Sequence, residues 1–360
     1  MAAPSQRPAK RARTTSDAPA VERHPEVWLS DGNIIVVSRQ VAFRVHKSIL
    51  SHHSEIFRDL FSLPDQGADE MMEGCPVVRL DADDPIDLQR LFLVLCCGKK
   101  CVDCSLSFLP SLITTHVSYY STNDEILPVS VDILASLVRM GHKYAIPSVL
   151  THALSRLKRY YTSDLKAWDD PEERARYVDA TPLDAIDVIQ LAHLTDTPSI
   201  LPTAYLISCG LIHSSYTAPG DKAGQLVLRD FQNQDLLRIM GGYTQLLQAA
   251  ADRILPLASV VGLGMCTTRT RCAVNSIELL RARHIDRSVF KKLDHRGALG
   301  PLDTWFLKHP TARLCSACDA KVRQLDALYR ANAWSKLPLI FQLDLTPGDW
   351  PSEKLDVSQA

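Results

Sequence analysis

The first regular patterns in the chain are those of two strands. A β-branched apolar run covers residues 33–37, behind the turn-forming pair Asp31-Gly32, and residues 41–45 alternate between large apolar side chains and others. An apolar run bounded by turn residues indicates a buried strand, and alternation with a period of two indicates a half-buried one. The two segments therefore predict a β-hairpin connected through residues 38–40.

Beyond the hairpin, the spacing of apolar residues changes from two to about 3.6, which is the helical period. Ile49 and Leu50 form one apolar turn, and Ile56 and Phe57 begin a second set that continues with Leu60 and Phe61. Ser54 stands immediately before the second set, where a hydroxyl accepts a hydrogen bond from a backbone N–H of the first turn. This pattern predicts two short helices, the second of them capped by Ser54.

Taken together, the residues of this stretch resemble a known family. The string F-x-V-H-K-x-I-L-x-x-x-S-x-x-F-x-x-x-F behind an aspartate is similar to the opening of a BTB/POZ domain. The matching positions are Asp31, Phe43, Val45, His46, Lys47, Leu50, Ser54, Phe57 and Phe61. The resemblance covers about residues 26–161 and implies an α+β BTB/POZ fold, a short sheet with clustered helices, in which His46 is a structural signature residue.

The remaining elements of such a domain can be placed along the chain. Residues 76–80 predict a strand, and Asp84-Pro85 predicts a helix start, because an N-cap aspartate precedes a proline whose missing N–H is not needed. A pair of helices around residues 134–157 would close the domain. Residues 64–75 are expected to form a polar loop. Residues 98–129 form a long insertion where the family usually has a short link, and a loop of this length is either functional or disordered.

The C-terminal half predicts an all-α domain. Residues 163–181 are charged and polar, as in a linker or a boundary helix, and Thr181-Pro182 with Asp184 is a helix-capping pattern. A later helix is predicted with Leu236, Ile239, Met240, Tyr243, Leu247 and Ala250 on its inner face. This half is similar to the tails of BTB proteins that are abundant in mushroom-forming fungi. The expected organisation is a disordered basic tail (1–22), a BTB/POZ domain (23–162), an α-helical domain (163–345) and a C-terminal tail (346–360).

Composition narrows the function classes. The 360 residues carry a formal net charge of −1, which argues against a protein that coats nucleic acid, and we expect no direct sequence-specific nucleic-acid binding. No run of 18 apolar residues and no secretory signal is found, so we expect no membrane partner and a nuclear or cytoplasmic location. In a reducing compartment the ten cysteines would be thiols or metal ligands. A small basic cluster near the N-terminus has the composition of a nuclear-import signal or of a solvated tail: Arg7, Lys10, Arg11 and Arg13.

The strongest candidate for chemistry is a set of four cysteines, Cys266, Cys272, Cys315 and Cys318. A C-x5-C and a C-x2-C pair can converge on one tetrahedral Zn²⁺, and four thiolates would leave no open position, so such a zinc would staple the helical domain. The other interpretation is that they are small buried hydrophobes. A replacement ligand among His284, His295 and His309, or a redox pair at 315 and 318, is also open.

A second cysteine cluster lies at the start of the insertion and comprises Cys96, Cys97, Cys101 and Cys104. It is interpreted either as a second metal site or as unpaired loop cysteines.

The sequence predicts a non-enzymatic protein-interaction module. No phosphate-binding loop, nucleophile elbow or H-E-x-x-H motif is present, and a lone His46 without a placed partner does not make a catalytic triad. The resemblance implies homodimerisation through the BTB domain and an adaptor or scaffold role, including presentation of unknown protein partners to a cullin-type ubiquitin ligase. The alternative is a nuclear regulator of transcription or chromatin.

Overall fold

The computed structural model describes residues 21–62, 70–96, 128–217, 231–259, 264–285, 299–300 and 313–351. The described residues up to 96 form one compact unit, and those from 128 onward form another. Residues 1–20 of the expected basic tail (1–22), residues 98–127 of the expected insertion (98–129) and the last nine residues lie outside the described residues. None of the described helices is long and apolar enough to cross a membrane.

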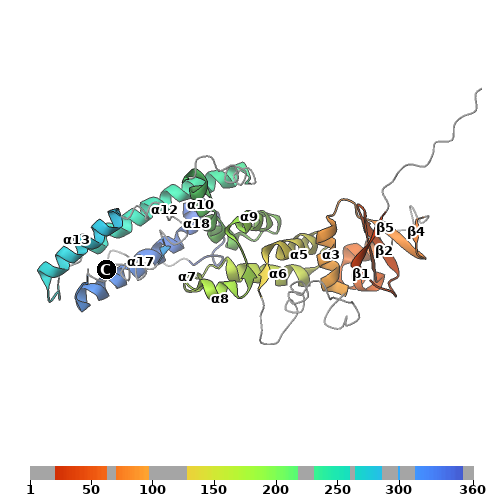
Figure 1. Ribbon diagram of the computed structural model, residues 1–360, viewed down its shortest axis with the longest axis horizontal. Helices are drawn as coiled ribbons and strands as arrows, with labels where there is room; N and C mark the ends of the chain where they lie inside the picture. The colour runs from red at the N-terminus through yellow and green to blue at the C-terminus, as the bar shows by residue number, and fades with distance from the viewer. Residues whose placement is uncertain are drawn as a thin grey trace, which may run out of the picture. The chain divides into compact units, whose positions relative to one another are not determined.

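The first unit is built on a five-stranded sheet with the strand order β1-β3-β2-β5-β4. Figure 1 shows this sheet in red and orange. Its strands are β1 (Glu22–Trp28), β2 (Ile34–Ser38), β3 (Val41–Val45), β4 (Met71–Met72) and β5 (Cys75–Arg79). The predicted hairpin is the antiparallel pair β2/β3, while β1 joins β3 and β5 joins β2 in parallel. The edge strands β1 and β4 were not predicted from the sequence, because β1 (ERHPEVW) is mostly polar and β4 is only two residues long.

Strand β2 is the middle strand of the sheet, and side chains pack against both of its faces. On one face Val36 pairs in register with Phe43 of β3, whose ring meets Phe92 edge to face at 5.4 Å. On the other face Ile35 and Val37 pack with Ala42 and Cys75. A continuous apolar run is what a strand buried on both sides requires.

Three helices accompany the sheet, and their starts follow the sequence signals. They are α1 (Lys47–His53), α2 (Glu55–Leu60) and α3 (Pro85–Cys96). The Ser54 hydroxyl accepts a hydrogen bond from the Phe57 N–H at 3.0 Å, and the Asp84 carboxylate accepts one from the Ile86 N–H at 2.9 Å. Both predicted caps are confirmed.

The second unit is helical, with one two-stranded ladder. Its longer helices are α5 (Val131–Lys143), α6 (Pro147–Tyr160), α9 (Ala185–Leu194), α10 (Leu201–Thr217), α12 (Asn233–Ser259), α13 (Arg269–Ile285) and α17 (Ser316–Ser335). Its short elements are α7 (Leu165–Trp168), α8 (Pro171–Ala175), η1 (Pro182–Asp184), η2 (Pro198–Ile200), α18 (Leu337–Ile340) and the parallel pair β6 (Val129–Ser130) and β7 (Val178–Asp179). The capping box between Thr181 and Asp184 is present as predicted. The BTB fold with a helical C-terminal region agrees with the fold class expected from the sequence.

The segment 163–181 is packed against the C-terminal helices, which favours the boundary-helix interpretation over a linker. Trp168 of α7 is buried, and its ring lies 5.5 Å from that of Trp334 in α17. The Trp334 indole N–H donates to the Ser163 carbonyl at 2.7 Å. Arg330 donates to both carboxylate oxygens of Asp169 at 2.6 and 2.7 Å.

The inner face of α12 differs from the predicted one. Ile239 and Ala250 are buried as expected, but Met240 is 40% exposed and Leu246 is buried instead of Leu247. The buried stripe includes Gly242, which a search for large apolar side chains at helical spacing does not find.

Gly242 provides a test of this packing. A Cβ at this position would overlap the ring of Phe341, which is fully buried, whereas a Cβ at Gly241 meets nothing within 4 Å. We expect Gly242→Ala to lower the free energy of unfolding by about 1–3 kcal/mol through overpacking. The matched control, Gly241→Ala, should raise it by up to about 1 kcal/mol through helix propensity. Thermal and urea denaturation followed by circular dichroism measure both, and equal effects of the two substitutions would contradict the packing described.

Candidate functional site

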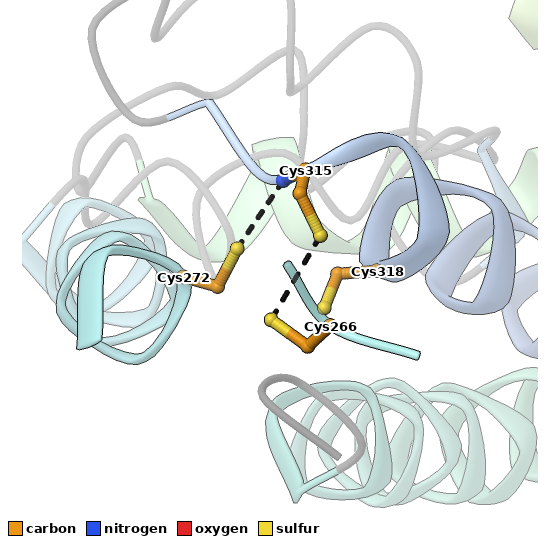
Figure 2. Close-up of side chains that lie close together, drawn as sticks. All are labelled: Cys266, Cys272, Cys315 and Cys318. Atoms are coloured by element: carbon orange, nitrogen blue, oxygen red, sulfur yellow. Dashed lines mark hydrogen bonds between the residues drawn. The ribbon is translucent and has the colours of Figure 1, made fainter. Parts of the chain in front are cut away.

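Four cysteines from two distant segments meet in the helical unit. Cys266 lies in the segment before α13 and Cys272 in the first turn of α13, while Cys315 is the N-cap residue of α17 and Cys318 lies in its first turn. All four sulfur atoms lie within 4.8 Å of one another, and Figure 2 shows the side chains converging. The structure therefore brings together the whole set that the sequence singled out.

The spacing of the sulfurs suits a tetrahedral metal ion. Ligand sulfurs bound at about 2.3 Å in a tetrahedron lie about 3.8 Å apart. The Sγ atoms of Cys315 and Cys266 are separated by 3.8 Å (Figure 2). The four cysteines are thus placed where one ion could hold all of them.

Backbone N–H groups favour the thiolate form of Cys315. The backbone N–H groups of Cys318 and Thr267 donate hydrogen bonds to the Cys315 sulfur. These bonds, the one from Cys318 contributing most, lower the pKa of that thiol to about 5. The Cys315 N–H itself donates to the Cys272 sulfur at 3.2 Å. Metal binding requires the deprotonated thiol, so the start of α17 prepares at least Cys315 for that role.

The four sulfurs differ in exposure. Cys272 and Cys318 are buried, at 0% and 3% exposure, while Cys266 and Cys315 are partly exposed. Nearby, the buried Asn275 of α13 donates to the Arg313 carbonyl at 2.6 Å, just before Cys315. This hydrogen bond is a second tie between α13 and the start of α17, and it does not depend on a metal.

The other candidate ligands are not part of the described site. The side chain of His284 and the whole of His295 and His309 lie outside the described residues. Of the second cysteine cluster only Cys96 is described, at the end of α3, and Cys97, Cys101 and Cys104 lie outside the described residues. Within the part of the chain that the structure describes, the four converging cysteines are the one group of His, Cys, Asp or Glu residues placed to hold a metal ion.

The BTB signature residues hold the hairpin and first helices together. His46 is the N-cap residue of α1, and its Nε2 lies 3.2 Å from the Asp31 carboxylate. The Lys47 ammonium donates to the Phe61 carbonyl at 2.9 Å. Phe43, Leu50 and Phe57 are fully buried, and the Ser54 hydroxyl caps α2. These contacts are structural, which fits the interpretation of His46 as a signature residue.

One polar cluster in the helical unit was missed from the sequence. The buried Asp235 of α12 accepts hydrogen bonds from the Tyr205 hydroxyl at 2.5 Å and from His193 at 3.1 Å. Burial, followed by the bond to Asp235, raises the pKa of Tyr205. The three residues lie 12 and 30 positions apart along the chain, so no local motif marks them. They join α9, α10 and α12, which is a structural role.

Comparison with known proteins assigns the first unit. Residues 29–120 match the family model described as the BTB/POZ domain. No curated protein and no solved structure gave a match to the chain. The matched range includes the β2/β3 hairpin, α1 to α3 and all the signature residues. The chain therefore carries a BTB/POZ domain, a protein-interaction module, followed by a helical C-terminal region.

Proposed function

We propose that this protein is a non-enzymatic adaptor that self-associates through its BTB/POZ domain. The observation that carries the proposal is the match of residues 29–120 to the BTB/POZ family, whose members commonly self-associate and bind cullin-type partners. The signature residues of this chain are engaged in packing and capping, so the unit has the ordered core that an interaction surface needs. The helical unit would then present or hold a second protein.

Recruitment of a cullin-type scaffold is the finer form of this proposal. The insertion at 98–129 follows α3 in the neighbourhood that makes this contact in ligase-recruiting relatives. Residues 97–127 lie outside the described residues. Co-purification of a cullin with the full chain, compared with a chain in which residues 101–126 are replaced by a short link, tests whether the insertion permits the contact.

Self-association can be tested on the early helices. Ile56 of α2 is 42% exposed and Ile86 of α3 is 54% exposed. BTB self-association buries an apolar face made by the early strand and helices, so Ile56→Glu should place an unpaired charge in that interface and raise the dissociation constant at least tenfold. Ile86→Glu introduces the same charge at an exposed position of α3 instead of α2 and is the matched control. Sedimentation equilibrium at micromolar concentration should show a dimer for the unaltered chain and the control; a monomeric unaltered chain would refute the proposal.

We further propose that the four cysteines bind one structural zinc ion. Zinc is borderline-soft and accepts four thiolates in a closed tetrahedron, and the 3.8 Å separation of two of the sulfurs supports this geometry. Such an ion would join the segment before α13 to the first turn of α17. With no open position, its contribution would be to stability.

The metal content provides the test. The purified chain should contain one zinc per molecule by elemental analysis, and Cys318→Ser should lose most of it and lower the melting temperature of the helical unit. Cys209→Ser is the matched control: Cys209 is buried and its thiol donates to the Ile239 carbonyl at 3.7 Å, away from the cluster. Zinc retained in Cys318→Ser, or zinc lost in Cys209→Ser, would argue against the assignment.

A nuclear role is the second candidate function, favoured by the basic cluster of Arg7, Lys10, Arg11 and Arg13, which lies outside the described residues. A short cluster of Lys and Arg residues is what an acidic import receptor binds. Replacing Lys10, Arg11 and Arg13 with alanine should move a fluorescent fusion from the nucleus to the cytoplasm, whereas replacing Arg23, a basic residue of β1, should not. An unchanged distribution in the triple variant would rule out this signal.

A further inference from the structure

We propose that the four-cysteine centre is a redox-controlled staple, in which peroxide joins Cys266 to Cys315 and releases the metal while α13 and α17 stay linked. The inference rests on the proposed zinc site and concerns its regulation. Its basis is the unequal exposure of the four side chains and the short separation of the two exposed sulfurs.

Cys266 and Cys315 are the pair that an oxidant reaches. Both side chains are partly exposed, whereas Cys272 and Cys318 are buried. Their sulfurs lie 3.8 Å apart and face each other in Figure 2. The Cys272 sulfur is held by hydrogen bonds with the Cys315 N–H and the Thr268 hydroxyl. Access therefore selects these two sulfurs, and their separation is short enough for a reaction between them.

The backbone around Cys266 allows this pair to close. Cys266 precedes α13 and lies two residues after Gly264, which has a φ of +57°. Cys315, in contrast, is the N-cap residue of α17. The sulfurs must approach from 3.8 Å to about 2.05 Å, and the non-helical segment can supply that shift without unwinding α17.

The chemistry is a two-electron oxidation by hydrogen peroxide. One thiolate attacks the O–O bond, forms a sulfenic acid and releases hydroxide; the second thiolate attacks that sulfur, forms the S–S bond and releases a second hydroxide. Two electrons pass from the two sulfurs to one peroxide molecule. Cys272 and Cys318 would be the two remaining ligands, and two thiolates would not enclose an ion. The metal would then be released, and each of the two thiolates would take up a proton from water.

The segment before α13 and the start of α17 would stay linked when the disulfide replaces the metal. The disulfide would connect residues 49 positions apart, and the Asn275 bond to the Arg313 carbonyl holds the same junction without a metal. Oxidation would thus convert a metal staple into a covalent one rather than unfold the helical unit. A thiol reductant and zinc would restore the first state.

The experiment uses the zinc-loaded full chain treated with hydrogen peroxide. A chromogenic chelator should report about one zinc released per peroxide consumed, and peptide mapping under non-reducing conditions should find the Cys266–Cys315 disulfide. Reduction followed by added zinc should reverse both signals. The chain with Cys97, Cys101 and Cys104 replaced by serine should behave in the same way, which excludes the loop thiols as the source.

Two variants that each lack one ligand, assayed after a chelator has removed any metal, keep the disulfide testable on its own. Cys272→Ser lacks one ligand but retains the reactive pair, so it should form the disulfide; Cys266→Ser lacks the pair and should not. Absence of zinc from the purified chain would refute the proposed metal site. The comparison of Cys272→Ser with Cys266→Ser would still decide whether Cys266 and Cys315 form a disulfide. Zinc that is bound but resists peroxide, or a disulfide between Cys315 and Cys318 instead, would overturn the inference.

Discussion

Arg253 of α12 and Asp326 of α17 form an ion pair whose two side chains are almost entirely buried, with a nitrogen to oxygen distance of 2.5 Å. Burial lowers the pKa of Arg253, and the nearby Asp326 opposes that change. A buried charge without its partner costs several kcal/mol, so the pair tolerates little sliding of one helix along the other. Arg330, one turn further along α17, adds a second constraint by binding both oxygens of Asp169. The register of α17 is therefore set by charges that must meet, and other contacts of the helical unit depend on that register.

The position of the four cysteines follows from this register. Because Asp326 fixes the middle of α17, the first turn that carries Cys315 and Cys318 is fixed as well, about two turns away. Among the described side chains of α13, on the opposite wall of the site, Val274 and Ile277 are 52% and 50% exposed, so both are only partly packed. A metal ion or a disulfide would therefore tie the α13 region to α17 at a place where these two side chains add little apolar packing. Loss of that tie would destabilise this end of the helical unit before it disturbed the Arg253–Asp326 ion pair.

The sequence predicted those features that local patterns determine. The hairpin, the Ser54 cap and the capping box at Thr181 each depend on residues within a few positions of one another, and each is present. The inner face of α12 was partly wrong, because its buried stripe contains Gly242 and charged residues whose partners come from α10 and α17. The cysteines could be grouped by spacing and chemistry, but their convergence across more than 40 residues depends on the pairing of α12 with α17. Ion pairs between distant helices leave no periodic signal, so the sequence could suggest that the four sulfurs meet, while only the structure shows how the helices bring them together.

The two units differ in what their cores require. The sheet unit is closed by apolar contacts on both faces of β2, and its buried cysteine, Cys75, hydrogen-bonds to the Gly32 carbonyl at 3.4 Å without a second thiol in the described contacts. An oxidant that acts on the exposed pair of the helical unit thus finds no equivalent pair in the described core of the BTB/POZ domain. The oxidation proposed for Cys266 and Cys315 would therefore act on the helical unit, where the segment before α13 meets the start of α17.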